Sequence, residues 1–262
     1  MHQYLFFIGN FPIRLYGIFF SLGIISGCIT AYFLLKKDRR GWESHMFDLG
    51  LVIAFAGIVG GRLWDVFFFD WEYYHNHLLE IPYIWQGGMA IQGGIIFACI
   101  AAYFYLKKHQ IPVLPFADTV TPGIILGQAI GRIDNFMNGD AFGHPTGQDF
   151  GLLYPDTTLA YHTYGAQPLW PAEVWECQGD LLIFVLLLWY GCKTRAEGTT
   201  FCLYIMFYSL LRFFLENYRG DYGTLALGLK SAQLTSLAAF AGAFILFLYF
   251  HFKHKSKSGI SE

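Results

Sequence analysis

Seven long apolar stretches alternate with short polar segments along the chain. Each stretch is long enough to cross the roughly 30 Å hydrocarbon core of a bilayer, which takes about 17–25 helical residues. The predicted transmembrane helices lie near residues 15–35, 46–68, 88–106, 115–138, 172–191, 199–217 and 231–252. The pattern therefore predicts an all-α, polytopic membrane protein in which residues 1–262 form a single integral-membrane domain.

The basic residues predict how these helices are oriented. They cluster after the first, third, fifth and seventh stretches, whereas the connections at 70–87 and 139–171 contain no Lys or Arg. Because cytoplasmic loops are enriched in Lys and Arg, the N-terminus should lie outside and the C-terminus in the cytoplasm. Segment 139–171 is long, polar and rich in Gly, Pro, Tyr and His, and should form an ordered cap or loop on the outer face.

The composition favours a membrane protein and argues against other classes. Only 14% of the residues are charged, whereas a soluble domain has about 25%. A net charge of −2 provides no basic face for a nucleic acid. The five cysteines form no CxxC pair, so we expect neither a disulfide framework nor a metal site, and no cofactor is implied.

The fourth stretch carries a polar stripe. At about 100° per residue, Gln128, Arg132, Asn135 and Asn138 fall on one arc of roughly 120°. An arginine at membrane depth costs at least about 2.5–3.5 kcal/mol, so it marks a functional site by default. The stripe predicts an inward-facing polar site with a cation at its centre.

The sixth stretch carries a second stripe of Tyr208, Arg212, Glu216 and Arg219, which share an arc of about 80°. One explanation is a structural ion pair between Arg212 and Glu216 at i,i+4. However, one carboxylate does not neutralise the arginines of two helices. The surplus positive charge favours an anion, and a phosphate matches the guanidinium fork.

Other polar groups leave alternatives open. Arg62 and Asp65 at i,i+3 could satisfy each other, and the glycine pairs within 87–94 indicate either a broken helix lining a cavity or close helix packing. On the fifth stretch, Glu173, Glu176 and Asp180 share a face and could balance the arginines. Together these features predict an outward-facing intramembrane cavity for an anionic amphiphile such as a phospholipid.

The motifs resemble those of bacterial prolipoprotein diacylglyceryl transferases. GRIDNFMNGDAFG at 131–143 is similar to the family signature G-R-x-x-N-F-x-N-x-E-x-x-G. The resemblance extends over nearly the whole chain, through Leu15-Tyr16-Gly17, Gly60-Gly61-Arg62, GGMAIQGG at 87–94, Leu211-Arg212-Phe213, Glu216, Arg219 and Gln233. Seven spans with the N-terminus outside also fit this family.

The resemblance implies a reaction in the bacterial cytoplasmic (inner) membrane, at a site that opens toward the outer side. The diacylglyceryl group of phosphatidylglycerol moves to the lipobox cysteine thiol in the signal peptide of a preprolipoprotein, and glycerol 1-phosphate leaves. The implied catalytic residues are Arg132, Arg212, Asn135, Gln92 and Tyr16. Those implied to bind phosphatidylglycerol are Arg132, Arg212, Asn138, Asp140, Gly143, Arg62, Glu216 and Arg219.

Three positions depart from the family pattern. Gln92 stands where the family usually has His, Asp140 replaces the signature Glu, and 170–176 reads WPAEVWE in place of H-P-S-x-x-Y-E. Glutamine cannot take up a proton, so the general base stays unassigned. An alternative is a catalytically altered or inactive paralogue that binds phospholipid or modifies another acceptor. An anion transporter is a third reading, against which the absence of an internal repeat counts.

Overall fold

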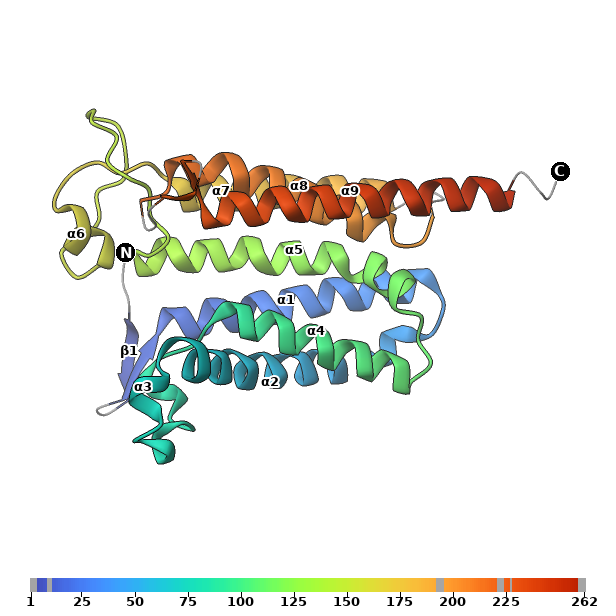
Figure 1. Ribbon diagram of the computed structural model, residues 1–262, viewed down its shortest axis with the longest axis horizontal. Coiled ribbons are helices and arrows are strands. Elements are labelled where there is room, and N and C mark those ends of the chain that lie inside the picture. The colour runs from blue at the N-terminus through green and yellow to red at the C-terminus, as the bar shows by residue number, and fades with distance from the viewer. Residues whose placement is uncertain (1–3, 9–10, 192–195, 221–223, 227, 259–262) are drawn as a thin grey trace. The chain divides into compact units, whose positions relative to one another are not determined.

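The computed structural model describes residues 4–8, 11–191, 196–220, 224–226 and 228–258. The described chain is predominantly helical (Figure 1). It divides into two compact units, one made of residues 1–34 and 117–262 and the other of residues 35–116. Each unit is described separately below.

The first unit contains the long helices that carry both polar stripes. They are α1 (Leu15–Asp38), α5 (Val113–Asn138), α7 (Ala172–Gly191), α8 (Thr199–Leu215) and α9 (Ser231–Ser258). The α8 helix packs against both α7 and α9. Ile125, Ile183 and Leu187 form a buried core between α5 and α7, with α8 side chains packed against it.

Glycines bring α1 and α5 into backbone contact. A Cβ atom on Gly27 would lie 2.7 Å from the carbonyl oxygen of Gly123, and one on Gly23 would lie 3.0 Å from that of Gly127. Within each helix the two glycines are four residues apart, which is the small-xxx-small spacing that allows two helices to approach closely in a membrane. This contact fixes the helix that carries Arg132.

A buried carboxylate ties α5 to the beginning of α8. Asp118 accepts hydrogen bonds from the backbone N–H groups of Gly198 (2.6 Å) and Phe201 (2.8 Å). The first N–H groups of a helix lack intrahelical partners and carry a partial positive charge, so a carboxylate there is stabilising. The two arginine-bearing helices are therefore anchored to each other at the ends opposite the arginines.

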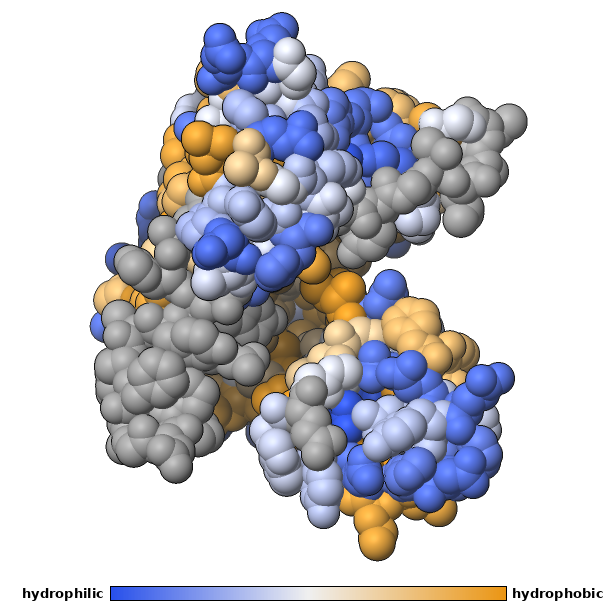
Figure 2. Space-filling view, turned by 90° about the vertical axis from the view of Figure 1, so that its left-hand side faces the viewer, coloured by the Kyte–Doolittle hydropathy of each residue, from blue (hydrophilic) through white to orange (hydrophobic). Residues whose placement is uncertain are grey.

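Segment 139–171 folds as an ordered cap that contains the short helix α6 (Leu159–Tyr164) and its own core of Phe142, Tyr154, Ala160 and Leu169. Figure 2 shows a mainly hydrophilic surface over the cap. The Tyr154 hydroxyl donates to the buried Glu173 carboxylate at the start of α7. Burial, followed by the charge of Glu173, raises the pKa of the Tyr154 hydroxyl. The location of this segment on the outer face stays a prediction.

Two short antiparallel strand pairs complete the first unit. The strand β1 (Tyr4–Ile8) pairs with β2 (Phe11–Arg14), and β3 (Thr224–Ala226) pairs with β4 (Leu229–Lys230). Neither pair was predicted, because runs of two to five residues are too short to show a strand periodicity. The all-α prediction is therefore correct for the body of the protein and incomplete at these junctions.

The second unit consists of α2 (Met46–Trp64) and α4 (Ile91–Lys108) with shorter elements around them. These are η1 (Trp42–His45), the π-helix η2 (Asp65–Phe69), α3 (Trp71–Tyr74), η3 (Leu78–Glu80) and η4 (Ile84–Gln86). Gly60 and Gly93 bring α2 and α4 into contact, because a Cβ on Gly60 would lie 2.6 Å from the Gly93 carbonyl oxygen. Close packing therefore explains the second glycine pair, at 93–94. The first pair, Gly87 and Gly88, has positive φ angles of 97° and 73°, so the helix begins at Ile91 and not at the predicted residue 88.

Five described helical segments have the length and hydropathy of a membrane span: Gly17–Asp38, Trp42–Phe69, Val113–Asn138, Thr199–Tyr218 and Ser231–Lys255. The other two predicted spans correspond to α4 and α7, with 18 and 20 residues. Large apolar side chains lie exposed along these helices, such as Phe55 (72%) and Ile245 (65%), as hydrocarbon surroundings require. The chain is a membrane protein, while the count of seven spans and the N-out orientation stay predictions.

Candidate active site

Three arginines converge on one buried carboxylate in the first unit. Glu176 of α7 lies 2.9 Å from Arg132 Nη2, 3.2 Å from Arg212 Nη1 and 3.4 Å from Arg219 Nη1. The Glu176 side chain has no exposed surface. The two stripes predicted from helical spacing therefore meet, and a residue on a third helix joins them.

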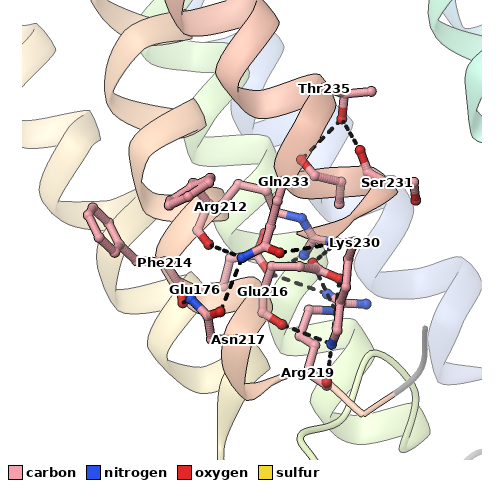
Figure 3. Close-up of polar contacts among 12 residues, drawn as sticks. Glu176, Arg212, Phe214, Glu216, Asn217, Arg219, Lys230, Ser231, Gln233 and Thr235 are labelled. Atoms are coloured by element: carbon pink, nitrogen blue, oxygen red, sulfur yellow. Dashed lines mark hydrogen bonds and ion pairs between the residues drawn. The ribbon is translucent and has the colours of Figure 1, made fainter. Parts of the chain in front are cut away.

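A second glutamate, Glu216, lies beside the first. Its carboxylate is 2.9 Å from Arg212 Nη2, 3.9 Å from Arg219 Nε and 4.0 Å from Lys230 Nζ (Figure 3). The predicted i,i+4 pair of Arg212 and Glu216 is confirmed, and it forms one part of a larger network. We call this network the arginine–glutamate cluster, which comprises Arg132, Glu176, Arg212, Glu216, Arg219 and Lys230.

The cations of this cluster differ in how far a ligand could reach them. The side chains of Arg132 and Arg212 retain 19% and 15% of their surface, whereas Arg219 retains 6% and both glutamates none. Arg219 therefore serves mainly to hold the carboxylates. Arg132 and Arg212 are therefore the arginines of the cluster whose positive charge a ligand could reach.

The C-terminal end of α5 builds a hydrogen-bonded chain behind Arg132. Arg132 Nη1 donates to Asn135 Oδ1 (3.0 Å), and Asn135 and Asn138 each donate to one oxygen of Asp140 (2.7 Å in both cases). Gly139, with φ of 75°, ends the helix in the left-handed conformation and turns Asp140 back over the last turn. Each oxygen of the shorter carboxylate at position 140 thus accepts one amide hydrogen bond and retains capacity for a further donor.

Gly143 allows the cap to approach the cluster. Its backbone pairs with that of Arg219, and a Cβ at this position would lie 2.7 Å from Trp170 Cβ. The neighbouring N–H of Gly220 donates to Phe142 O (3.0 Å). The glycine of the signature therefore has a clear local reason, because a side chain at this position would collide with Trp170.

The described contacts do not connect three predicted residues to this cluster. Arg62 belongs to the second unit, where it is 3% exposed and donates to the carbonyl oxygens of Glu80, Ile81, Gly87 and Gly88 at 2.6–3.2 Å. Its distance of 4.0 Å to Asp65 makes the anticipated pair a secondary contact. Gln92 lies exposed in the first turn of α4, also in the second unit, and Tyr16 is in the first turn of α1, with its side chain outside the described residues.

Two members of the cluster were absent from the predicted site. Glu176 was predicted only as a balancing charge, and Lys230 was not predicted to belong to the site. The sequence did contain a signal for Glu176. Three inward arginines and one glutamate leave an excess of positive charge, which the acidic residues on one face of the fifth stretch could neutralise. The signal for Lys230 was its position directly before the last apolar stretch.

The geometry defines an integral-membrane protein with a buried arginine–glutamate cluster, from which two arginines remain accessible. A sequence profile of the prolipoprotein diacylglyceryl transferase family matches residues 3–249. The chain therefore belongs to the prolipoprotein diacylglyceryl transferase family.

Relatives across most of the chain agree with this assignment. The phosphatidylglycerol–prolipoprotein diacylglyceryl transferase of Clostridium botulinum strain Langeland is 35% identical over 238 residues, covering 90% of this chain and 92% of that protein. The proteins of the same name from Staphylococcus saprophyticus and Halalkalibacterium halodurans are 36% and 33% identical, over 88% and 92% of this chain and 82% and 84% of their own lengths. The predicted resemblance is thus confirmed.

Proposed function

We propose that this protein transfers the diacylglyceryl group of phosphatidylglycerol to the lipobox cysteine of a preprolipoprotein. The name shared by its relatives gives the reaction class and both substrates. The structural observation that carries the proposal is the pair Arg132 and Arg212, which are held 2.9 Å and 3.2 Å from one buried glutamate and remain accessible.

The chemistry requires a cationic site. The thiol sulfur attacks the glycerol carbon that bears the phosphate ester, a C–S bond forms, and the C–O bond breaks with its electron pair. The leaving glycerol 1-phosphate departs as a dianion when the thiol proton passes to a base, and becomes a monoanion if it then takes up that proton itself. Preorganised cations stabilise the charge that develops on the phosphate in the transition state.

Arg132 and Arg212 fit this task through their shape as well as their charge. A guanidinium presents a planar fork of donors that matches two phosphate oxygens. Glu176 sets the separation of the two guanidiniums, because it holds one on each carboxylate oxygen. The same positive field lowers the pKa of an approaching thiol from about 8.5 toward neutrality.

The amide chain behind Arg132 suits the polar head of the lipid. Asn138 and Asp140 lie at the end of α5, close to the accessible arginine, where hydroxyl groups of the glycerol head could donate to the Asp140 carboxylate. Asn135 keeps the Arg132 side chain in one orientation. Glu216 and Arg219 hold Arg212 and Glu176 in place from behind.

We further propose seven spans with the N-terminus outside, in the cytoplasmic membrane of a bacterium. The acyl chains of the donor would stay in the bilayer beside the apolar helices, and the thiol would reach the phosphate from the outer side. The lysine and arginine distribution supports this orientation, since the segments at 70–87 and 139–171 lack both residues.

A direct assay tests the reaction. Purified protein in phosphatidylglycerol nanodiscs receives a synthetic lipobox peptide, and mass spectrometry follows the mass of a diacylglyceryl thioether. A peptide with serine in place of the lipobox cysteine, and nanodiscs of phosphatidylcholine, are the controls. Absence of the thioether, under conditions in which a relative from the family produces it, would reject the proposal.

Gln92 supports one competing function, a family member that binds phospholipid but acts on another acceptor or not at all. Glutamine can donate and accept hydrogen bonds but cannot hold the thiol proton. If this chain is an active transferase, Gln92→His raises its rate only modestly, about two- to threefold, because the arginine field already favours the thiolate. A wild-type protein that is inactive and gains activity only with Gln92→His would favour the competing function.

A further inference from the structure

Lys230 lies at the end of β4, directly before α9, and its ammonium group contacts the backbone of the turn that follows α8, which ends at Leu215. Lys230 Nζ donates to the backbone carbonyl oxygens of Glu216 (2.9 Å) and Arg219 (2.5 Å) and lies 4.0 Å from Glu216 Oε1 (Figure 3). Its side chain is only 14% exposed. Carbonyl groups at the end of a helix lack intrahelical partners, so a cation there stabilises the helix end.

Gln233, in the first turn of α9, closes the same junction. Its Oε1 accepts the backbone N–H of Lys230 (3.0 Å), and its Nε2 donates to Phe213 O (3.3 Å) and Asn217 Oδ1 (3.1 Å). Gln233 is 3% exposed. We call these contacts of Lys230 and Gln233 the α8–α9 latch, because they fix the stretch of chain between Arg212 and Arg219.

The latch also contributes charge to the site. The ion pairs of Glu176 and Glu216 involve Arg132, Arg212, Arg219 and Lys230, so these six groups by themselves carry four positive and two negative charges. The buried carboxyl group of Asp180, one turn from Glu176 on α7, is a further acidic group beside them and is not part of this count. The formal surplus of two positive charges equals the charge of a departing phosphomonoester. Without Lys230 the surplus would be one, which matches the phosphodiester of the substrate instead.

We propose that Lys230 is a positioning residue for the transfer reaction and acts through Glu216 on Arg212; this inference rests on the function proposed above. The ammonium group of Lys230 neutralises part of the negative charge of Glu216. The Arg212 guanidinium is then attracted less strongly to Glu216 and can interact more strongly with the phosphate. The second negative charge of the phosphate appears only as the C–O bond breaks. Loss of Lys230 should therefore lower kcat and leave KM for phosphatidylglycerol nearly unchanged.

The test compares substitutions of Lys230, directly before α9, with a substitution of Lys253 near the C-terminal end of α9. Lys230→Met removes the charge with little change in volume, Lys230→Arg retains it, and Lys253→Met is the matched control at an exposed lysine of α9, whose Nζ contacts only the Tyr249 side chain among the described hydrogen bonds (3.4 Å). We expect kcat of Lys230→Met to fall about tenfold, less than the 10²–10³ typical for loss of a direct donor. Lys230→Arg should recover most of kcat, and Lys253→Met should match the wild type.

Three outcomes would overturn the inference: an unchanged kcat in Lys230→Met, an equal fall in Lys230→Arg, or a rise in KM that accounts for the whole loss. Thermal unfolding in detergent shows which variants are folded. If Lys230→Met does not fold, Lys230→Gln keeps donors for the two carbonyl oxygens without the charge, and its kcat decides. An inactive wild type rejects the proposed function, whereas an active wild type with an unaffected Lys230 variant rejects only this inference.

Discussion

The substitution Glu176→Gln should lower the stability of the protein and raise its affinity for anions. Glu176 is fully buried and contacts Arg132, Arg212 and Arg219 at 2.9–3.4 Å, so Glu176→Gln leaves three guanidiniums with one carboxylate less. Removing one partner of a buried ion pair costs about 3–5 kcal/mol. We expect a loss near the lower end, about 3 kcal/mol, because Glu216 still balances two of the arginines; for a chain of this size that is a fall in Tm of roughly 6–12 °C.

The same substitution should strengthen the binding of anions, since the cluster gains one unit of net positive charge. If inorganic phosphate binds the Glu176→Gln variant with a Kd near 1 mM, 10 mM phosphate adds about 1.4 kcal/mol of stability. Phosphate should thus recover roughly 3–6 °C of the lost Tm, and should affect the wild type less.

Thermal unfolding of detergent-solubilised protein, with and without phosphate at constant ionic strength, measures both effects. Glu72→Gln on the exposed face of α3 is the matched control and should shift stability by no more than about 0.5 kcal/mol. A Glu176→Gln variant as stable as the wild type would show that Glu176 does not neutralise the arginines. A destabilised variant on which phosphate has no effect would refute the accessible cationic site.

Two further predictions concern the accessible arginine and the cap. Arg132→Lys keeps the charge but loses the guanidinium fork, so product formation should fall about 10²-fold with Tm nearly unchanged; activity within twofold of the wild type would contradict bidentate phosphate binding. Tyr154→Phe removes the donor to the buried Glu173 carboxylate and should cost about 1–3 kcal/mol in a denaturation experiment. Because the pKa of Tyr154 is raised on folding, its contribution is complete below the ordinary tyrosine pKa near 10 and is lost as the pH rises above that value. A stability that is independent of pH from 9 to 11 would exclude this explanation.

The periodic part of the fold and of the site could be predicted from the sequence. Apolar runs located the helices, and the four-residue spacing put Arg212 and Glu216 together, where the structure has them. These predictions depend on interactions within one helix, whose geometry is fixed by the backbone. The helical arc drawn through Arg219 was wrong, because α8 ends at Leu215 and Arg219 has an extended backbone, from which it still reaches Glu216. The family resemblance added the signature at 131–143, which the profile match supports.

The contacts between helices could not be predicted in this way. Glu176 is separated from Arg132 by 44 residues and from Arg212 by 36, and the helix-to-helix register that brings them together is set by packing over the whole unit. The short strand pairs and the start of α4 at Ile91 depend on turns, where single residues such as Gly88 decide the path. Lys230 lay in such a junction, outside every periodic pattern.

The glycine contacts between α1 and α5 have a consequence for an enzyme that works inside its own substrate. Between Gly27 and Gly123 the two helices meet through backbone atoms, with no side-chain rotamers to reorganise. Lipid composition alters the surroundings of side chains on the helix exterior, whereas it has no access to this seam. Gly127 lies five residues before Arg132, or about 7.5 Å along the helix axis. Arg132 is therefore positioned from a rigid helix contact, which stays the same as the surrounding phospholipid is consumed and replaced.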